Sequence, residues 1–275
     1  MLMTVKHVQP TSSFFASHPV FTVGEFAAAR AGADLSARAI EALLAYHTKL
    51  GHVLRLRRGL YASVPADSSA WNFQADSFLV AAKIADDAVL AYHTALEFHG
   101  KAHSVHQRFL YLTRRASRPF SFRGARFRGL SFPAALKTRA AEQFGVRTFL
   151  RAGLDVRVTS LERTLVDVLD RPQFGGGWEE IWRSLESVEF FDLDQVIEYA
   201  LLLDNATTVA KVGFYLEQHK TQLMVQEDHL RRLRKHRPRK PHYLSRTDRE
   251  SGHLVPGWSL VIPEDVLERR WQEVA

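Results

Sequence analysis

The stretch from Thr22 to Ser63 constrains the fold most, because it carries start and stop signals for two helices and a hairpin in close succession. Thr22 and Glu25 have the spacing of a capping box, in which each side chain satisfies a free amide at a helix start. Gly32 interrupts this first helix, and Ser36 can cap a second one. The second helix has an apolar stripe at three- and four-residue spacing, comprising Ile40, Leu43, Leu44 and Leu50.

Two short strands are expected after the second helix, at Val53 to Arg57 and at Leu60 to Ser63. Between them, Gly59 can adopt the left-handed conformation that closes a three-residue hairpin. Two helices, a tight turn and a hairpin predict a winged helix-turn-helix domain. We place this domain at residues 1–65, because the following segment VPADSS contains the Pro and Ser residues of a connector.

The charge of this segment favours DNA as its partner. Residues 1–63 contain seven basic and three acidic residues. An α-helix fits the major groove of B-DNA, and a basic hairpin can lie along the phosphate backbone or enter the minor groove. The alternatives are a protein-interaction module or a structural cap with the same fold. The residues expected to contact DNA are Ser36, Arg38, Lys49, Arg55, Arg57 and Arg58.

A second basic surface is expected further along the chain. Residues 101–151 contain twelve Lys or Arg residues and one acidic residue. From Arg108 onward, aromatic or aliphatic residues alternate with arginines, a period of two that is typical of half-buried antiparallel strands. Such a sheet can bind nucleic acid by stacking bases on its aromatic rings. The alternatives are a solvated cationic face and a docking face for a second DNA contact or an acidic partner. The arginines expected on the exposed side are Arg114, Arg115, Arg118, Arg123, Arg126 and Arg128.

The remaining clusters of reactive side chains do not predict catalysis. The histidines between His93 and His106 lack the converging ligand set of a metal site, and we expect them to border a buried helix. The carboxylates of the segment SLERTLVDVLD are spread around one helix and do not form a nuclease site. In that helix, we expect a capping box from Thr159 to Glu162 and an ion pair between Glu162 and Arg163. The GGGW motif lacks the lysine and Ser/Thr of a phosphate-binding loop.

Four segments together resemble one protein family. GHVLRLRRGLYAS, AYHTALEFHG, VTSLERTLVDVLDRPQFGGGWEEIWRSLE and AKVGFYLEQH resemble the AbiEi-type antitoxins of type IV toxin–antitoxin systems. The resemblance implies an α+β protein in which the winged helix precedes a larger mixed α/β antitoxin domain, here residues 66–275. It also implies a transcriptional repressor that binds inverted repeats in its own promoter. The functional partner would be a nucleotidyltransferase-like toxin of the AbiEii type, countered without a stable complex.

Composition sets the outer limits of function. The chain has no cysteine, which excludes disulfides and thiolate metal sites and fits a reducing cytoplasm. It has no apolar run of membrane-spanning length and no apolar signal core, so we expect a cytoplasmic protein without a membrane partner. We expect no enzyme activity, cofactor or metal, and a monomer that binds DNA in multiple copies. Two alternatives remain: a plain winged-helix transcription factor with a sensing C-terminal domain, and a metal-dependent nuclease.

Overall fold

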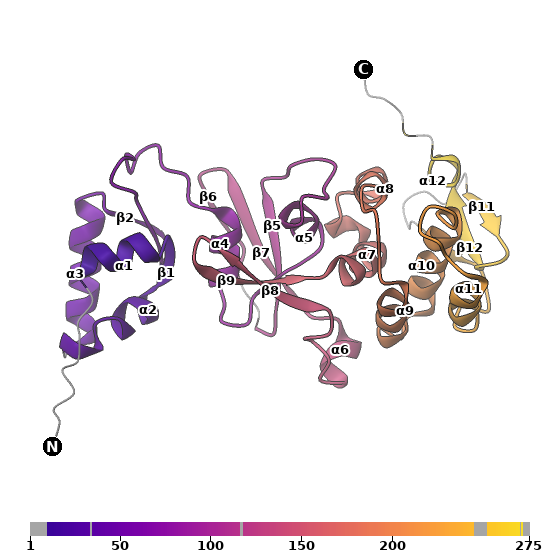
Figure 1. Ribbon diagram of the computed structural model, residues 1–275, viewed down its shortest axis with the longest axis horizontal. Helices are drawn as coiled ribbons and strands as arrows, with labels where there is room; N and C mark the ends of the chain where they lie inside the picture. The colour runs from indigo at the N-terminus through magenta and orange to yellow at the C-terminus, as the bar shows by residue number, and fades with distance from the viewer. Residues whose placement is uncertain (1–9, 34, 116–117, 245–251, 270, 272–275) are drawn as a thin grey trace.

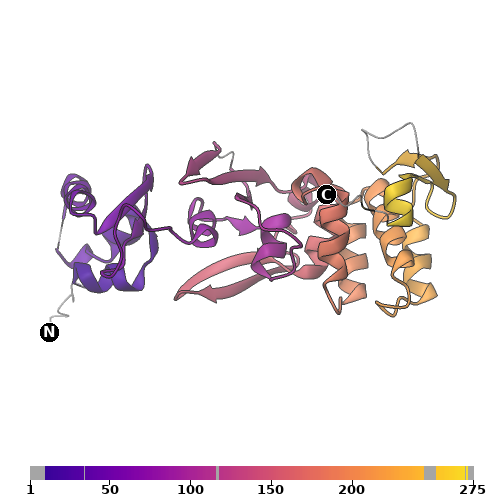
Figure 2. The ribbon, with the colours of Figure 1, turned by 90° about the horizontal axis from the view of Figure 1, so that it is seen from above.

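The computed structural model describes residues 10–33, 35–115, 118–244, 252–269 and 271. The molecule is elongated, with three parts arranged along its long axis (Figure 1). Helices and a small sheet form the N-terminal end, a six-stranded sheet lies in the centre, and helices with a second small sheet form the C-terminal end. Seen from above, the central sheet separates the two ends (Figure 2). The expected α+β class is confirmed.

The N-terminal part is a small sheet packed against three helices. Its strand order is β1-β3-β2 and all pairs are antiparallel. Its own core contains Phe14, Phe21, Phe26, Ile40 and Leu44, all nearly inaccessible to solvent. The elements are α1 (Thr11–Ser17), β1 (Val20–Thr22), α2 (Val23–Ala28), a 3₁₀ turn (Ala31–Ala33), α3 (Ala37–Lys49), β2 (Val53–Arg57) and β3 (Leu60–Ser63).

Local hydrogen bonds explain where these elements begin and end. The Glu25 amide donates to Thr22 Oγ1 at 3.2 Å and the Thr22 amide donates to Glu25 Oε2 at 2.8 Å, so the capping box of α2 is confirmed. Ser36 Oγ accepts from the Ala39 amide at 3.2 Å and starts α3. Gly59 has φ +81°, as a hairpin turn here requires. The placement of Leu50 in the apolar stripe is wrong: it follows the end of α3 and is 49% exposed.

The central sheet has the strand order β6-β7-β5-β4-β9-β8. It is mixed, so the expectation of an antiparallel sheet is wrong: β5 pairs with β7 in parallel, and β4 pairs with β9 in parallel. After β5, the chain forms the hairpin β6–β7, and β7 inserts between β5 and β6. Alternating hydrophobicity cannot reveal this, because it is the same for both strand directions. The strands are β4 (Val89–Leu90), β5 (Arg108–Thr113), β6 (Phe120–Phe122), β7 (Ala125–Ser131), β8 (Val146–Arg151) and β9 (Leu154–Thr159).

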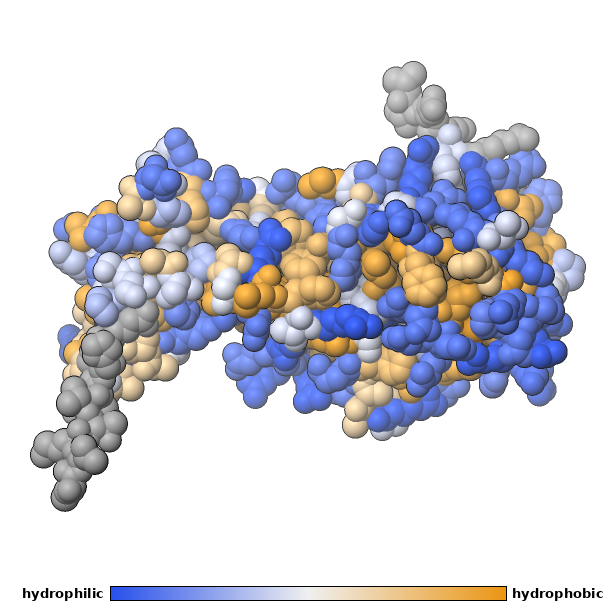
Figure 3. Space-filling view, viewed as in Figure 1, coloured by the Kyte–Doolittle hydropathy of each residue, from blue (hydrophilic) through white to orange (hydrophobic). Residues whose placement is uncertain are grey.

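Each face of the central sheet is covered by a different set of elements. The core of one face includes residues of α5 (His93–Phe98), α7 (Leu161–Asp170) and α8 (Trp178–Glu186). The core of the other face includes α4 (Ser77–Lys83), which also packs against the N-terminal sheet. Figure 3 shows that apolar atoms gather in the middle of the central and C-terminal parts of the viewed face, between hydrophilic residues.

The N-terminal sheet therefore contributes to two cores. Leu56 and Leu60 of the hairpin belong to the same buried cluster as Leu79 and Val80 of α4. The Lys83 ammonium group of α4 also pairs with the Glu25 carboxylate of α2. The connector at 64–69 contains no helix or strand, but the apolar contacts continue across it. Removing residues 1–65 would expose this shared core.

The C-terminal part is mostly helical. Trp258 is fully buried against α10, and its indole donates to Glu217 Oε2 at 2.7 Å. Gly213 makes this packing possible, because a Cβ there would lie 2.1 Å from the Trp258 ring. The elements are α9 (Leu193–Leu202), α10 (Ala206–Gln218), α11 (Glu227–Arg234), β10 (His242–Tyr243), β11 (Gly252–Val255), β12 (Leu260–Pro263) and α12 (Glu264–Glu268); α6 (Ala134–Thr138) and a 3₁₀ turn (Pro172–Phe174) precede them.

The expected capping box and ion pair of α7 are wrong. Ser160, not Thr159, caps the helix, and its hydroxyl accepts from the Arg163 amide at 3.3 Å. Arg163 pairs with Asp167 rather than with Glu162, because only a carboxylate one turn further on lies on the same buried face.

Within the described residues, no helix is long and apolar enough to cross a membrane.

Candidate nucleic-acid interface

The exposed side of α3 carries the first group of expected DNA contacts. Arg38 and Lys49 are exposed, and the small residues Ala42 and Ala45 between them are exposed as well. Positions 38, 42, 45 and 49 repeat at three- or four-residue spacing, so they follow one face of the helix. The result is a smooth helix face with a positive charge near each end, bordered by the exposed Glu41. Ser36 is exposed at the start of this helix and also serves as its cap.

A β-bulge divides the arginines of the hairpin between two sides of the sheet. Arg55 pairs with Tyr61 and Arg57 pairs with Leu60, so the register shifts between them. Such a bulge changes the direction of the side chains that follow it. Arg55 is exposed and lies opposite Tyr61, whose ring packs in the same core as α3. Arg58 is exposed at the hairpin tip, next to Gly59.

Arg57 lies against the central part of the molecule. Its guanidinium carbon is 5.3 Å from the centre of the Phe120 ring in β6, and its side chain is half-buried. Arg57 thus contacts the neighbouring part of the same chain, whereas Arg55 and Arg58 remain exposed. The sequence predicted the hairpin but not the register shift that produces this division.

The expected second basic surface is split into two grooves and one structural residue. The first groove is lined by Arg57, Arg114, Arg115 and Arg118 together with Asp86 and Asp87. Asp87 accepts from the Thr113 hydroxyl at 2.6 Å and from the Arg114 amide at 2.7 Å, and these bonds outweigh the effect of burial and lower the pKa of its carboxyl group. Negative charge therefore faces the arginines in this groove.

Arg123 has a structural role instead. It follows β6 in the left-handed conformation, with φ +47°, and its guanidinium donates to the backbone carbonyls of Phe73 and Ala70. These bonds fix the segment that precedes α4. Helix α4 begins directly after it, at Ser77, because Asp76 accepts from the amides of Phe78 and Leu79.

Arg126 and Arg128 line a second groove, together with Arg108, which was not among the residues expected on the basic surface. Arg108 and Arg126 are direct neighbours in the parallel pair β5–β7, and Arg128 is two residues further along β7. Their alternation with the buried Phe127 places Arg126 and Arg128 on one face of the strand. The opposite wall is formed by the loop before α8, including Gly176 and Gly177.

A hydrogen-bonded cluster of histidines and carboxylates lies behind this groove. His93 Nε2 and Glu180 Oε1 are 2.9 Å apart, and the Ser104 hydroxyl donates to Glu180 Oε2 at 2.6 Å. The rings of His93 and His106 are stacked, with centroids 3.8 Å apart. The His106 amide donates to Glu97 Oε1 at 2.5 Å. The Glu180 contact could not be predicted from local sequence patterns, because 87 positions separate Glu180 from His93.

The environment separates the pKa values of this cluster. Burial opposes the charge of Glu180, but hydrogen bonds from His93 and Ser104 outweigh it and lower the pKa of its carboxyl group to about 2. Burial likewise opposes the charge of His93, but Glu180 and Glu97 raise its pKa. Burial and the neighbouring His93 lower the pKa of His106. The cluster therefore favours a charged His93 beside a neutral His106.

Ligand atoms of His93, His106 and Glu180 all lie within 4.8 Å of one another, which raises the question of a metal site. The geometry does not suit one. The two imidazole rings are stacked at an interplanar angle of 11°, so their in-plane lone pairs run side by side and cannot converge on one ion. Glu180 already accepts hydrogen bonds from His93, Ser104 and Ser184. We interpret the group as a buried ion pair.

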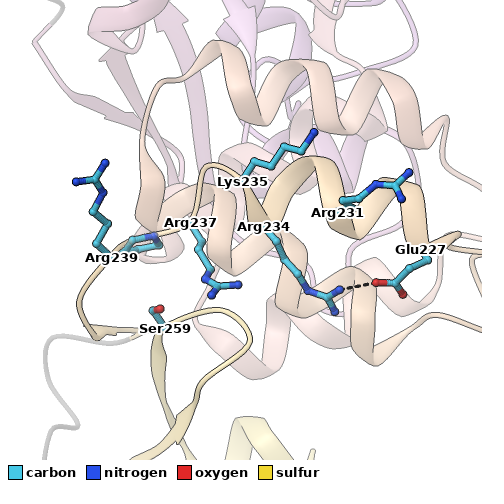
Figure 4. A pocket seen from close by; sticks show the side chains of 8 residues that line it. Glu227, Arg231, Arg234, Lys235, Arg237, Arg239 and Ser259 are labelled. Carbon is cyan, nitrogen blue, oxygen red and sulfur yellow. Dashed lines mark hydrogen bonds and ion pairs between the residues drawn. The ribbon is translucent and has the colours of Figure 1, made fainter.

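The most basic run of the sequence, residues 231–240, borders a cavity at the end of α11 (Figure 4). Arg234 pairs with Glu227 at 2.5 Å and lies over the Trp258 ring at 5.2 Å. Lys235 and Arg239 point in different directions from this pair (Figure 4). Residues 231–234 of the run belong to α11, where Arg231 and Arg232 pair with the carboxylates of Asp228 and Asp194, so the first part of the run is helical and its charges are largely paired.

Comparison with known proteins establishes the fold but no family. No family model matches the chain, and no curated protein matches it. Among solved structures, the chain is similar to the crystal structure of the RV2827C protein from Mycobacterium tuberculosis, with a TM-score of 0.61 and 16% sequence identity. The match covers 93% of this chain and 90% of that one. The whole three-part arrangement therefore has a solved counterpart, and at this identity the likeness concerns the fold alone.

Proposed function

We propose that this protein is a transcriptional regulator that binds duplex DNA through α3 and the β2–β3 hairpin, as a winged helix-turn-helix. One observation carries the proposal: exposed basic residues lie at both ends of a smooth helix face and on the adjacent hairpin. Within the described ranges, Arg38, Lys49, Arg55 and Arg58 have no ion-pair partner. Positive charges that the protein does not neutralise itself are suited to phosphate groups.

The more specific proposal is that the protein represses its own promoter and acts as a type IV antitoxin. The support is the resemblance of four sequence segments to AbiEi-type antitoxins. In this proposal the N-terminal part binds inverted repeats, and the central and C-terminal parts counter a nucleotidyltransferase-like toxin in the cytoplasm without a stable complex. We propose no catalytic role for the chain itself.

Binding to the DNA upstream of the gene tests the first proposal. Arg38 lies in the first turn of α3, the part of a recognition helix that reaches base edges. If the Arg38 guanidinium donates two hydrogen bonds to O6 and N7 of a guanine, Arg38→Ala should weaken binding to the promoter fragment by about 1–3 kcal/mol. Fluorescence anisotropy with the promoter fragment and a shuffled duplex of equal length measures this loss.

Arg147→Ala is the matched control, because Arg147 is an exposed arginine on β8, outside the proposed interface. Equal effects of the two substitutions on promoter binding would contradict the role of α3. The antitoxin proposal is tested separately, with the full-length Arg38→Ala variant and the neighbouring toxin gene on independently controlled plasmids. We expect repression to fail while growth is still rescued. Loss of both functions in a folded protein would contradict their separation.

A further inference from the structure

The groove between β7 and the loop before α8 differs from the other basic surfaces in one respect. Its lining residues include Arg108, Arg126 and Arg128, but no aspartate or glutamate. The groove beside Arg114 contains Asp86 and Asp87, and the cavity beside α11 contains Glu227. Within the described ranges, none of the three arginines forms an ion pair.

The sheet fixes the spacing of these three charges. Arg108 and Arg126 are paired across adjacent parallel strands, which places their backbones about 5 Å apart. Arg126 and Arg128 are on the same face of β7, about 7 Å apart along the strand. Arg108 donates to the Gln173 carbonyl at 3.4 Å and the Arg128 guanidinium lies 5.5 Å from the centre of the Phe174 ring, so these contacts orient two of the three groups without neutralising their charge. The like charges repel one another, and an anion among them would offset this repulsion. The sheet therefore concentrates positive charge at a fixed spacing.

The surroundings of the groove allow a ligand to approach. Arg126 and Arg128 are exposed, and Arg108 is half-buried. The other polar residues that line the groove include the uncharged side chains of Gln107, Ser121 and Gln173, which can donate hydrogen bonds. The adjacent glycines are exposed, and Gly177 has open space where a side chain would be. The Glu180 and Glu97 carboxylates behind His106 are engaged by hydrogen bonds from His93, Ser104 and the His106 amide.

We propose that Arg108, Arg126 and Arg128 form a binding site for successive phosphate groups. Arginine binds phosphate through two parallel N–H···O bonds, and three arginines at fixed spacing suit a ligand with several linked phosphates. Two sources present this chemistry: the triphosphate of a free nucleotide and the backbone of a single nucleic acid strand. The site is separate from the α3 surface and does not depend on the proposed function.

Calorimetric titration of the full-length protein with two probes tests this proposal. The probes are ATP and a single-stranded octanucleotide without a terminal phosphate. Replacing Arg126 and Arg128 by Ala should weaken binding of at least one probe tenfold or more. Arg115→Ala with Arg118→Ala is the control, since it removes the same charge from exposed residues beside Asp86 and Asp87. The control should change Kd less than threefold.

The outcomes distinguish the two ligand sources and the two sites. A loss confined to ATP identifies a nucleotide site, and a loss confined to the octanucleotide identifies a strand site. Equal Kd values for the Arg126/Arg128 variant and the control, or no binding of either probe to the unaltered protein, would overturn the proposal. The Arg38→Ala variant should retain the binding of ATP, and the Arg126/Arg128 variant should retain promoter binding, so failure of one proposal leaves the other testable.

Discussion

Replacing Arg163 by Met should destabilise the protein strongly, because Arg163 is a fully buried charge. Its guanidinium donates to the carbonyls of Glu142 at 2.8 Å and Phe144 at 2.6 Å, and to Asp167 Oδ2 at 3.3 Å. Asp167 is also buried and accepts from the Tyr199 hydroxyl at 2.7 Å. The substitution leaves a buried carboxylate and two carbonyls without this donor.

Breaking a buried ion pair by removing one partner costs about 3–5 kcal/mol. For a chain of this size, each kcal/mol lowers Tm by about 2–4 °C, so a decrease of roughly 10 °C is expected. Urea denaturation followed by circular dichroism measures the free energy. Arg231→Met is the matched control, because Arg231 pairs with Asp228 on the surface of a helix. An exposed pair contributes only about 0–1 kcal/mol.

A double-mutant cycle tests the reasoning behind this magnitude. Arg163→Met together with Asp167→Leu removes both charges, so no buried carboxylate remains uncompensated. The double substitution should therefore cost clearly less than the sum of the two single ones. Additive effects, or a single substitution at Arg163 costing no more than the Arg231 control, would refute the interpretation of Arg163 as a buried structural charge.

Two other substitutions test the packing and the buried ion pair. Gly213→Ala should destabilise the C-terminal part by about 1–3 kcal/mol, because the added Cβ would lie 2.1 Å from the Trp258 ring; tryptophan fluorescence during urea unfolding measures this, and an unchanged midpoint would contradict it. The pKa of Glu180 is about 2 and so lies below its ordinary value of 4.5. The stabilising effect of the ionised Glu180 carboxylate is therefore complete above pH 4.5 and is lost as the pH falls towards 2. Glu180→Gln should flatten the decrease in stability over that range, and parallel pH profiles of the variant and the unaltered protein would exclude this role.

The sequence predicts the local structure of the N-terminal part well, because its signals are hydrogen bonds between near neighbours. The Thr22–Glu25 capping box, the Ser36 cap and the Gly59 turn are all confirmed. In this part, the residues at the ends of each helix and strand were sufficient to predict where the helix or strand begins or ends. By contrast, the prediction for Leu50 was wrong. Leu50 continues the apolar spacing of α3, but it follows the last residue of the helix and so lies beyond the part of the stripe that is buried.

The rest could not be predicted, because it depends on contacts between distant residues. The parallel pairing of β5 with β7 brings Arg108 beside Arg126, and no sequence periodicity encodes that pairing. Strand β11 pairs with β12 in a small C-terminal sheet that the sequence pattern did not predict. Of the arginines expected on the exposed side of the sheet, Arg126 and Arg128 lie on β7, whereas Arg114, Arg115, Arg118 and Arg123 lie between strands.

The core shared by the hairpin and α4 has a consequence for how copies would align on a duplex. Since Leu56 and Leu60 are buried with Leu79 and Val80, the hairpin and the central sheet are held in a fixed relative orientation. If α3 lies in the major groove, the direction of the long molecular axis is then set by the DNA helix. Inserting about five base pairs between two repeats would turn one copy by half a helical turn relative to the other. Operator spacing would thus decide whether neighbouring copies face each other or opposite sides of the duplex.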